Sequence, residues 1–152
     1  MRMCMWSSFL VTIALLASPT PTPGKASGHN DETRRFPTAN LVDTKLVDQQ
    51  LMGKPFMPGG TLANYKKGKI AYNMFLAKLP SPDAAAFLLL DWKKALTDAH
   101  LIPSFGGYFG RDDHDAGRPV FVFSKGAWIA GVVGLPEKDA DLQARALAAH
   151  LN

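Results

Sequence analysis

Two short segments near the end of the chain, RPVFVF and AWIAGVV, are apolar at nearly every position. The residues between them include Lys125-Gly126, which favour a turn, so the two segments predict a β-hairpin. Successive side chains of a strand point to opposite faces of a sheet, so both faces of this hairpin receive apolar side chains. We expect one face to hold Val120, Val122, Trp128, Ala130 and Val132, and the other to hold Phe121, Phe123, Ile129 and Val133. Neither face has the polar residues of a half-exposed sheet, so both faces must be covered.

A second hairpin and a helix are predicted in the middle of the chain. The segment TLANY and the alternating run from Ile70 to Ala77 flank a Lys-Lys-Gly turn. Ser81 is a natural N-cap and Pro82 fits the first helical position, so a helix is expected to follow and to end before Pro103. Its apolar, structural face is expected to consist of Ala84, Phe87, Leu88, Trp92, Ala95, Leu96 and Ala99.

Two more segments complete the predicted fold. SFGGYFG predicts a strand, and PEKDADLQARALAAHL predicts a helix that begins near Pro136 or Glu137. The order of elements is then two strands, a helix, three strands and a helix. Because an antiparallel meander cannot bury both helices inside itself, we expect an α+β fold: a single antiparallel sheet of about five strands with both helices packed on one face.

The segment before the first hairpin, LVDTKLVDQQLMGK, is interpreted as a short helix that stops at Gly53. Its apolar residues roughly share one helical face: Leu41, Val42, Leu46 and Leu51. We expect residues 41–57 to fold back over the second face of the sheet, because cover from within the chain costs the least entropy. The alternatives are a second subunit, a partner protein of the cell envelope, or a small apolar ligand.

Aromatic side chains gather around the apolar hairpin and mark the expected binding surface. A ligand or partner on this face would contact Phe105, Tyr108, Phe121, Phe123 and Trp128. Tyr108 and Trp128 are suited to such a surface, since each combines an apolar ring with a polar group. The favoured hypothesis is a non-catalytic secreted or periplasmic module that binds a protein partner, a second copy or a small apolar ligand, without a cofactor or metal.

The first residues have the features of a secretory signal peptide. Arg2 precedes an apolar run from Met5 to Ala17, which is too short to span a membrane. Small residues at Gly24 and Ala26 predict cleavage after Ala26. The polar residues 27–40 are then expected to form a flexible leader, and residues 41–152 a single domain.

Cysteine content and charge narrow the class of protein further. Cleavage removes Cys4, the only cysteine, so disulfides and thiolate chemistry are excluded from the mature chain. It also removes Arg2 and Lys25, two of the 17 basic residues, so the formal charge falls from +4 to +2. Positive and negative charges are mixed along the chain, which argues against a nucleic-acid partner. Without the signal segment no stable membrane anchor is expected, and the protein is predicted to be secreted or periplasmic.

One cluster of ionisable residues, in the stretch FGRDDHDAGRPVFVF, looks like a site for chemistry. A calcium loop needs acidic ligands at positions one, three and five and a glutamate at position twelve, and no register of this stretch supplies them. Aspartate and Gly117 are typical turn residues, so the cluster is interpreted as the solvated tip of a hairpin that tolerates substitution. The alternative is a small hydrolase or metal-dependent enzyme that uses Asp112, Asp113, His114 or Asp115.

A resemblance to a known family rests on five stretches: PGGTLANY, SPDAAAFLLLDWKKAL, GGYFG, RPVFVFSKG and GVVGLPEKDADLQARALAAHLN. Together they resemble a family of secreted bacterial proteins of unknown function, in which an Ala- and Phe-rich helix follows a long strand and a Gly-Gly-Tyr strand precedes an F-x-K-G turn. The similarity covers residues 57–152. It implies a bacterial source, export and this order of elements, and it assigns no activity and no functional residue.

Overall fold

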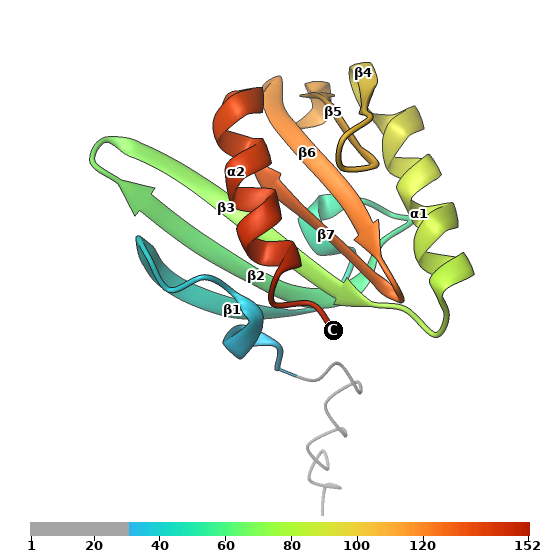
Figure 1. Ribbon diagram of the computed structural model, residues 1–152, viewed down its shortest axis with the longest axis horizontal. Coiled ribbons are helices and arrows are strands. Elements are labelled where there is room, and N and C mark those ends of the chain that lie inside the picture. The colour runs from blue at the N-terminus through green and yellow to red at the C-terminus, as the bar shows by residue number, and fades with distance from the viewer. Residues whose placement is uncertain (1–30) are drawn as a thin grey trace, which may run out of the picture.

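The computed structural model describes residues 31–152, and the expected signal peptide and cleavage site lie outside this range. The chain forms one seven-stranded antiparallel sheet in the order β1-β2-β3-β7-β6-β5-β4 (Figure 1). The strands are β1 (Leu41–Gln49), β2 (Pro58–Lys67), β3 (Ile70–Lys78), β4 (Thr97–Ile102), β5 (Gly107–Asp112), β6 (Arg118–Lys125) and β7 (Trp128–Val133). Two α-helices, α1 (Pro82–Ala95) and α2 (Glu137–Ala148), and three short 3-10 turns, η1 (Thr33–Arg35), η2 (Leu51–Gly53) and η3 (Asp113–Asp115), complete the described part. The α+β fold is confirmed, with seven strands rather than five.

The first additional strand is β1, where the sequence predicted a helix. LVDTKLVDQ pairs antiparallel with β2, from Leu41 opposite Tyr65 to Gln49 opposite Pro58, with one irregularity between Leu41 and Asp43. Its apolar residues satisfied a helical spacing only loosely, and pairing with an existing hairpin satisfies the backbone along the whole segment. The helix expected over residues 41–53 is therefore wrong.

The second additional strand is β4, which takes over the end of the expected helix. Ser81 caps α1 as predicted, because its hydroxyl oxygen accepts a hydrogen bond from the Ala84 backbone N–H at 3.1 Å. The helix ends at Ala95, however, and Leu96 is already extended, so that β4 can pair with β5. The competing sheet hydrogen bonds end the helix at Ala95, well before Pro103.

The buried face of α1 also differs from the expected one. Its buried residues are Ala85, Leu89 and Trp92, which recur at the three- and four-residue spacing of a helix face. Phe87 lies on the opposite side of the helix and is 68% exposed. The prediction that Phe87 is structural is therefore wrong, whereas Trp92 is completely buried, as predicted.

The two helices lie on opposite faces of the sheet, and this corrects the expectation of one shared face. In the β6–β7 hairpin Lys125 pairs with Trp128 and Phe123 with Ala130, one position away from the register that we expected. A shift of one residue moves every side chain of a strand to the other face. The face called here the α2 face carries Phe121, Phe123, Trp128, Ala130 and Val132; the α1 face carries Val120, Val122, Ile129 and Val133.

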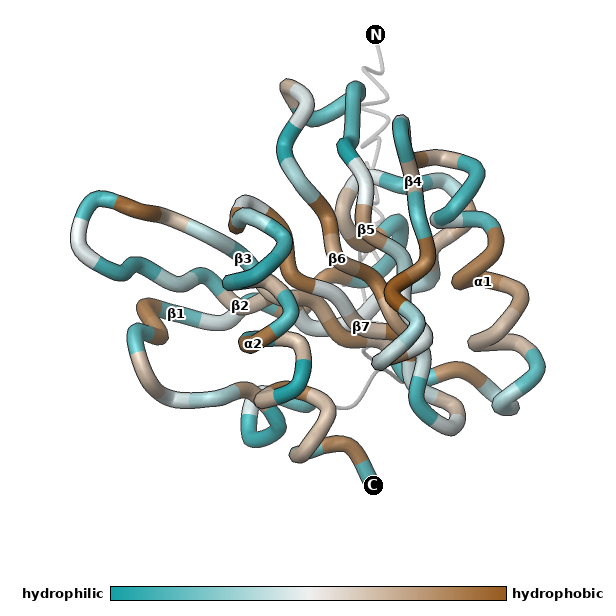
Figure 2. The backbone as a smooth tube through the Cα atoms, turned by 45° about the horizontal axis from the view of Figure 1, so that its top comes forward, coloured by the Kyte–Doolittle hydropathy of each residue, from teal (hydrophilic) through white to brown (hydrophobic). Residues whose placement is uncertain are grey.

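Both faces of the central strands are covered within the chain. On the α2 face, α2 contributes Ala140, Ala144 and Leu147 and lies across the front of β6 and β7 in Figure 1. On the α1 face, Trp92 stacks on Phe75 with ring centres 5.2 Å apart, and Leu51 and Met57 join the same cluster. Part of the segment 41–57 thus covers a sheet face as expected. Figure 2 shows hydrophobic residues along the central strands and hydrophilic residues at the hairpin tips.

Candidate functional site

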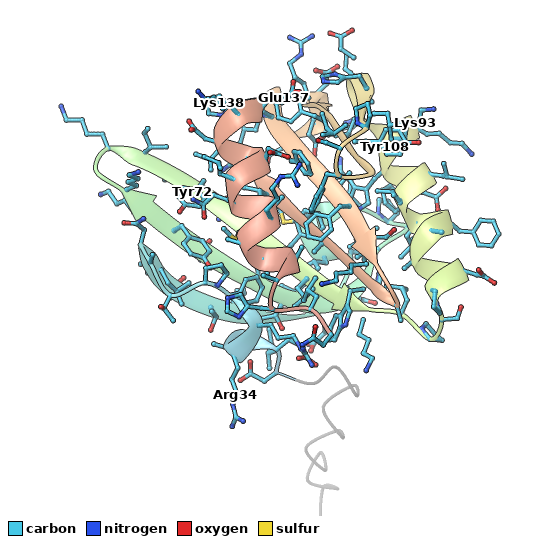
Figure 3. The ribbon with its side chains drawn as sticks, viewed as in Figure 1. Arg34, Tyr72, Lys93, Tyr108, Glu137 and Lys138 are labelled. Carbon is cyan, nitrogen blue, oxygen red and sulfur yellow. The ribbon has the colours of Figure 1, made fainter. Side chains whose placement is uncertain are left out.

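The five aromatic residues of the expected binding surface do not form one surface. Phe121, Phe123 and Trp128 are buried in the core on the α2 face, and the Arg35 guanidinium lies 4.6 Å from the Trp128 ring centre, so a ligand cannot reach these rings. Tyr108 packs on the α1 face, where the Lys93 ammonium lies 5.3 Å from its ring centre. Figure 3 labels both side chains. Phe105 is partly exposed at the margin of the α2 face. Of the five, Phe105 is therefore the aromatic residue on the α2 face that a ligand could reach.

Phe105 is held in place by the turn between β4 and β5. The Phe105 and Gly106 backbone N–H groups both donate to the Ile102 carbonyl, at 3.1 and 2.7 Å. Gly106 adopts a φ of 84°, a left-handed conformation that glycine accepts without strain. The Phe105 ring then packs edge-on against Phe121 and Phe123, with ring centres 5.5 and 4.8 Å away. The accessible ring is thus fixed to the core and does not swing freely.

A depression of about 390 Å³ opens beside this ring, between the end of α2 and the end of β6. Its lining residues are Phe105, Phe123, Ser124, Lys125, Arg145, Ala148 and Ala149. The aromatic rings and the two alanines form an apolar floor. The small alanine side chains leave the space that a larger residue at the same positions would fill.

Two cations stand at the rim of the depression. The Arg145 guanidinium lies 5.1 Å from the Phe105 ring centre, and it donates to Asp141 and to the Ser104 hydroxyl, each at 3.0 Å. The Lys125 ammonium donates to the Ala148 carbonyl at the end of α2, at 2.7 Å. These bonds position both cations but leave further N–H groups free to meet an acidic group.

The acidic stretch forms the tip of the β5–β6 hairpin, and most of it is exposed. Asp113 accepts a hydrogen bond from the Thr97 hydroxyl, and Asp115 lies 3.4 Å from Arg118. Ala116 and Gly117 both have left-handed φ values, of 54° and 69°, which reverse the chain after η3. Among residues 31–152 no group of three or more histidine, cysteine or acidic residues is placed to hold a metal ion.

Asp112 does not fit the interpretation of this stretch as a solvated hairpin tip, because it is buried and paired with Lys54. The Lys54 ammonium lies 2.8 Å from the Asp112 carboxylate, and the two residues are 5% and 4% exposed. Asp112 also accepts from the His114 backbone N–H at 3.1 Å, and Lys54 lies 5.6 Å from the Trp92 ring centre. The expectation that the whole cluster is solvated is therefore wrong for Asp112. No local pattern identifies Lys54 as its partner, since 58 residues separate them.

A row of polar side chains, also missed from the sequence, runs along the α1 face from β1 through β2 and β3 and ends at Arg118 of β6, with β7 between β3 and β6. Asn64 donates to Asp43 at 2.6 Å, Asn73 donates to Asn64 at 2.5 Å, and Arg118 donates to Asn73 at 2.9 Å. Gly134 makes room for Arg118, because a Cβ atom there would lie 2.6 Å from the guanidinium. Asn64 and Asn73 each donate and accept within the row, so the row stabilises the sheet, and Asp43 at its outer end keeps one carboxylate oxygen free within the described part of the chain.

The buried tyrosines of the β2–β3 hairpin are equally structural. The Tyr65 hydroxyl donates to the Pro37 carbonyl at 2.7 Å, and its ring stacks on Tyr72 with centres 5.0 Å apart. Burial raises the pKa of Tyr65, and the neighbouring Tyr72 raises it further. Burial also raises the pKa of Tyr72, whose position beside α2 is visible in Figure 3. Neither phenol is thus suited to act as a base near neutral pH.

Comparison of the chain with protein-family models, with curated proteins and with solved structures gives no match. Over residues 31–152 no helix is long and apolar enough to cross a membrane.

Proposed function

We propose that the protein is an exported, non-catalytic binding module, and that the depression beside Phe105 takes a small apolar molecule that carries an acidic group. The observation that carries this proposal is the half-buried Phe105 ring, which is fixed to the core and has the Arg145 guanidinium 5.1 Å from its centre. An apolar ligand body gains by leaving water on the aromatic and alanine floor. A carboxylate on such a ligand gains charge-assisted hydrogen bonds from the rim.

The size and the polarity of the depression agree with this class of ligand. A volume of about 390 Å³ lies near the lower end of the range of about 300 to 1,000 Å³ for small-molecule sites. Arg145 and Lys125 are the charged side chains of its lining, and both are positive. An apolar molecule without an acid would leave these cations without a partner from the ligand.

Export is the second part of the proposal. It is supported by the positively charged start, the apolar run and the small residues before position 27. The lack of any cysteine after Cys4 fits a fold that is stable without disulfides. In the envelope, a binding module of this kind would carry or sense an apolar acid, or present it to a partner protein.

The enzyme alternative gains no support from the acidic stretch. Asp112 forms an ion pair with Lys54, and Asp115 with Arg118, while Asp113 accepts a hydrogen bond from Thr97. His114 is exposed, and its backbone N–H rather than its ring faces Asp112. None of these groups lines the depressions beside His150, Ser104, Phe105 or Tyr72.

Matched ligands and a matched variant test the ligand site. Naphthoate and naphthamide share one apolar ring system and differ in charge, so titration followed by NMR chemical shifts separates the two contributions. We expect saturable binding of naphthoate, with weaker binding of naphthamide, and at least about a tenfold loss in Phe105→Ala, equal to about 1.4 kcal/mol. The control is Phe87→Ala, which removes an exposed phenylalanine from α1.

The proposal is wrong if naphthoate does not bind, or if Phe105→Ala and Phe87→Ala weaken it equally. Arg145→Met keeps an apolar stem and removes the charge, so it should abolish the preference for the acid over the amide. Native mass spectrometry of protein purified from its own envelope would then identify the natural ligand and any bound partner.

A further inference from the structure

Strand β1 is an edge of the sheet with an unpaired side, as Figure 1 shows. It is nine residues long and contains no buried residue, although it pairs with β2 along its length. Val42 and Leu46 on this strand are 63% and 49% exposed. Among residues 31–152, the backbone of Val42–Gln49 makes no hydrogen bond other than those to β2. A long edge of this kind is a template for pairing with another strand.

The opposite edge, β4, is blunted in a way that β1 is not. It has only six residues, and its pairing with β5 is interrupted between Thr97 and His100. Asp98 within it has a φ of 54°, which breaks the regular edge. In β1 the pairing is regular from Asp43 to Val47, so an uninterrupted row of outward backbone groups is available.

We propose that two copies of the protein associate through β1, in antiparallel register about a two-fold axis at Thr44, and form one continuous sheet. Such an axis is perpendicular to the sheet and passes between identical residues, so Thr44 faces Thr44 of the partner subunit. Lys45 then lies opposite the partner's Asp43, and the reciprocal pair forms on the other side of the axis. Val42 lies opposite the partner's Leu46. This inference is independent of the proposed ligand site.

Charge selects this register over its neighbours. An axis at Asp43 would place two aspartates opposite each other, and an axis at Lys45 would place two lysines opposite each other. With an axis at Leu46 or Val47, neither Asp43 nor Lys45 would lie opposite a residue of the other charge. The axis at Thr44 alone neutralises Lys45, the residue that would otherwise protect the edge from pairing.

The side chains are placed to allow this contact. Asp43 accepts from Asn64 through its Oδ1 atom, which leaves Oδ2 for the partner's Lys45. On the α2 face the Thr33 hydroxyl lies 3.0 Å from that of Thr44, so the η1 turn sits over the face of β1, where it contacts a side chain. The backbone groups on the outer side of the strand are left for the partner.

Two charge variants test the register. Sedimentation of the processed protein, over about 1 to 300 µM because a two-strand interface is small, should show a dimer that dissociates on dilution. Lys45→Asp and Asp43→Lys each place like charges opposite each other, so each alone should weaken the dimer at least tenfold. Mixed together they should recover it, as should the double variant. Lys94→Asp, on the exposed side of α1, is the control and should leave the dimer unchanged.

Each outcome decides the matter. A monomer at the highest concentration overturns the proposal, and so does a dimer that both single variants leave intact, because it would then form through another surface. Growth beyond the dimer would also contradict it, since an isologous contact closes. Loss of the dimer without recovery in the mixture would show that the register is wrong. Circular dichroism of each variant establishes that the fold is retained.

Discussion

Replacing Asp112 by asparagine should destabilise the protein far more than a substitution at a hairpin tip usually does. The change keeps the size of the side chain and one oxygen that can accept from Lys54, but it removes the negative charge. Lys54 is 5% exposed and its ammonium lies 2.8 Å from the carboxylate. Breaking a buried pair of this kind costs about 3 to 5 kcal/mol, because the remaining charge stays buried without compensation.

We expect about 3 kcal/mol for Asp112→Asn, at the lower end of that range, because the amide oxygen still accepts a hydrogen bond from the ammonium. The control is Asp113→Asn at the neighbouring exposed position, which should change stability by no more than about 0.5 kcal/mol. Urea denaturation at neutral pH, followed by circular dichroism, measures both values. The double variant Lys54→Met, Asp112→Leu should lose less than Asp112→Asn, since apolar residues remove the buried charge altogether.

The reasoning is refuted if Asp112→Asn and Asp113→Asn have equal small effects. That result would mean that water reaches the pair in solution, so that the ammonium does not depend on the carboxylate. If the double variant Lys54→Met, Asp112→Leu is much less stable than Asp112→Asn, the charged pair itself contributes net stability.

Three further predictions concern the core, a glycine and the buried phenols. Trp92→Ala should cost about 3 to 5 kcal/mol and Phe87→Ala less than about 0.5, as measured by urea midpoints. Gly134→Ala should cost about 1 to 3 kcal/mol, because its φ is 100° and the new methyl group meets Arg118. The pKa of Tyr65 is raised on folding, so its contribution to stability is complete below pH 10 and is lost as the pH rises further. Thermal midpoints should therefore fall above that pH, and less steeply in Tyr65→Phe.

Much of the fold could be predicted from local sequence patterns. The strands at the β2–β3 and β6–β7 hairpins, the Ser81 cap and the start of α2 at Glu137 were predicted, because turn residues, caps and alternation are encoded by neighbours. β1 and β4 were missed because their apolar residues also fit a helix, and their pairing with distant strands decided against it. The buried face of α1 was missed for a related reason, since Ala- and Leu-rich helices offer several apolar stripes.

The candidate site was harder to predict from the sequence than the fold was. The aromatic residues around the central hairpin were recognised, but their exposure depends on what covers each face. The β6–β7 register buries Phe121, Phe123 and Trp128 on the α2 face. Arg145, which lies beside Phe105, belongs to α2, much later in the chain, and nothing in the residues around it predicts this contact.

The amino-acid sequence by itself determined an antiparallel α+β fold without disulfides, whose central hairpin had to be covered on both faces. These properties follow from composition and short-range periodicity. The tertiary structure decided which face each side chain occupies, the burial of Asp112 against Lys54, and the exposure of β1 as a free edge. The physical reason is that a strand alternates sides at every residue, so a single step in register or one distant pairing reverses the environment of a whole segment.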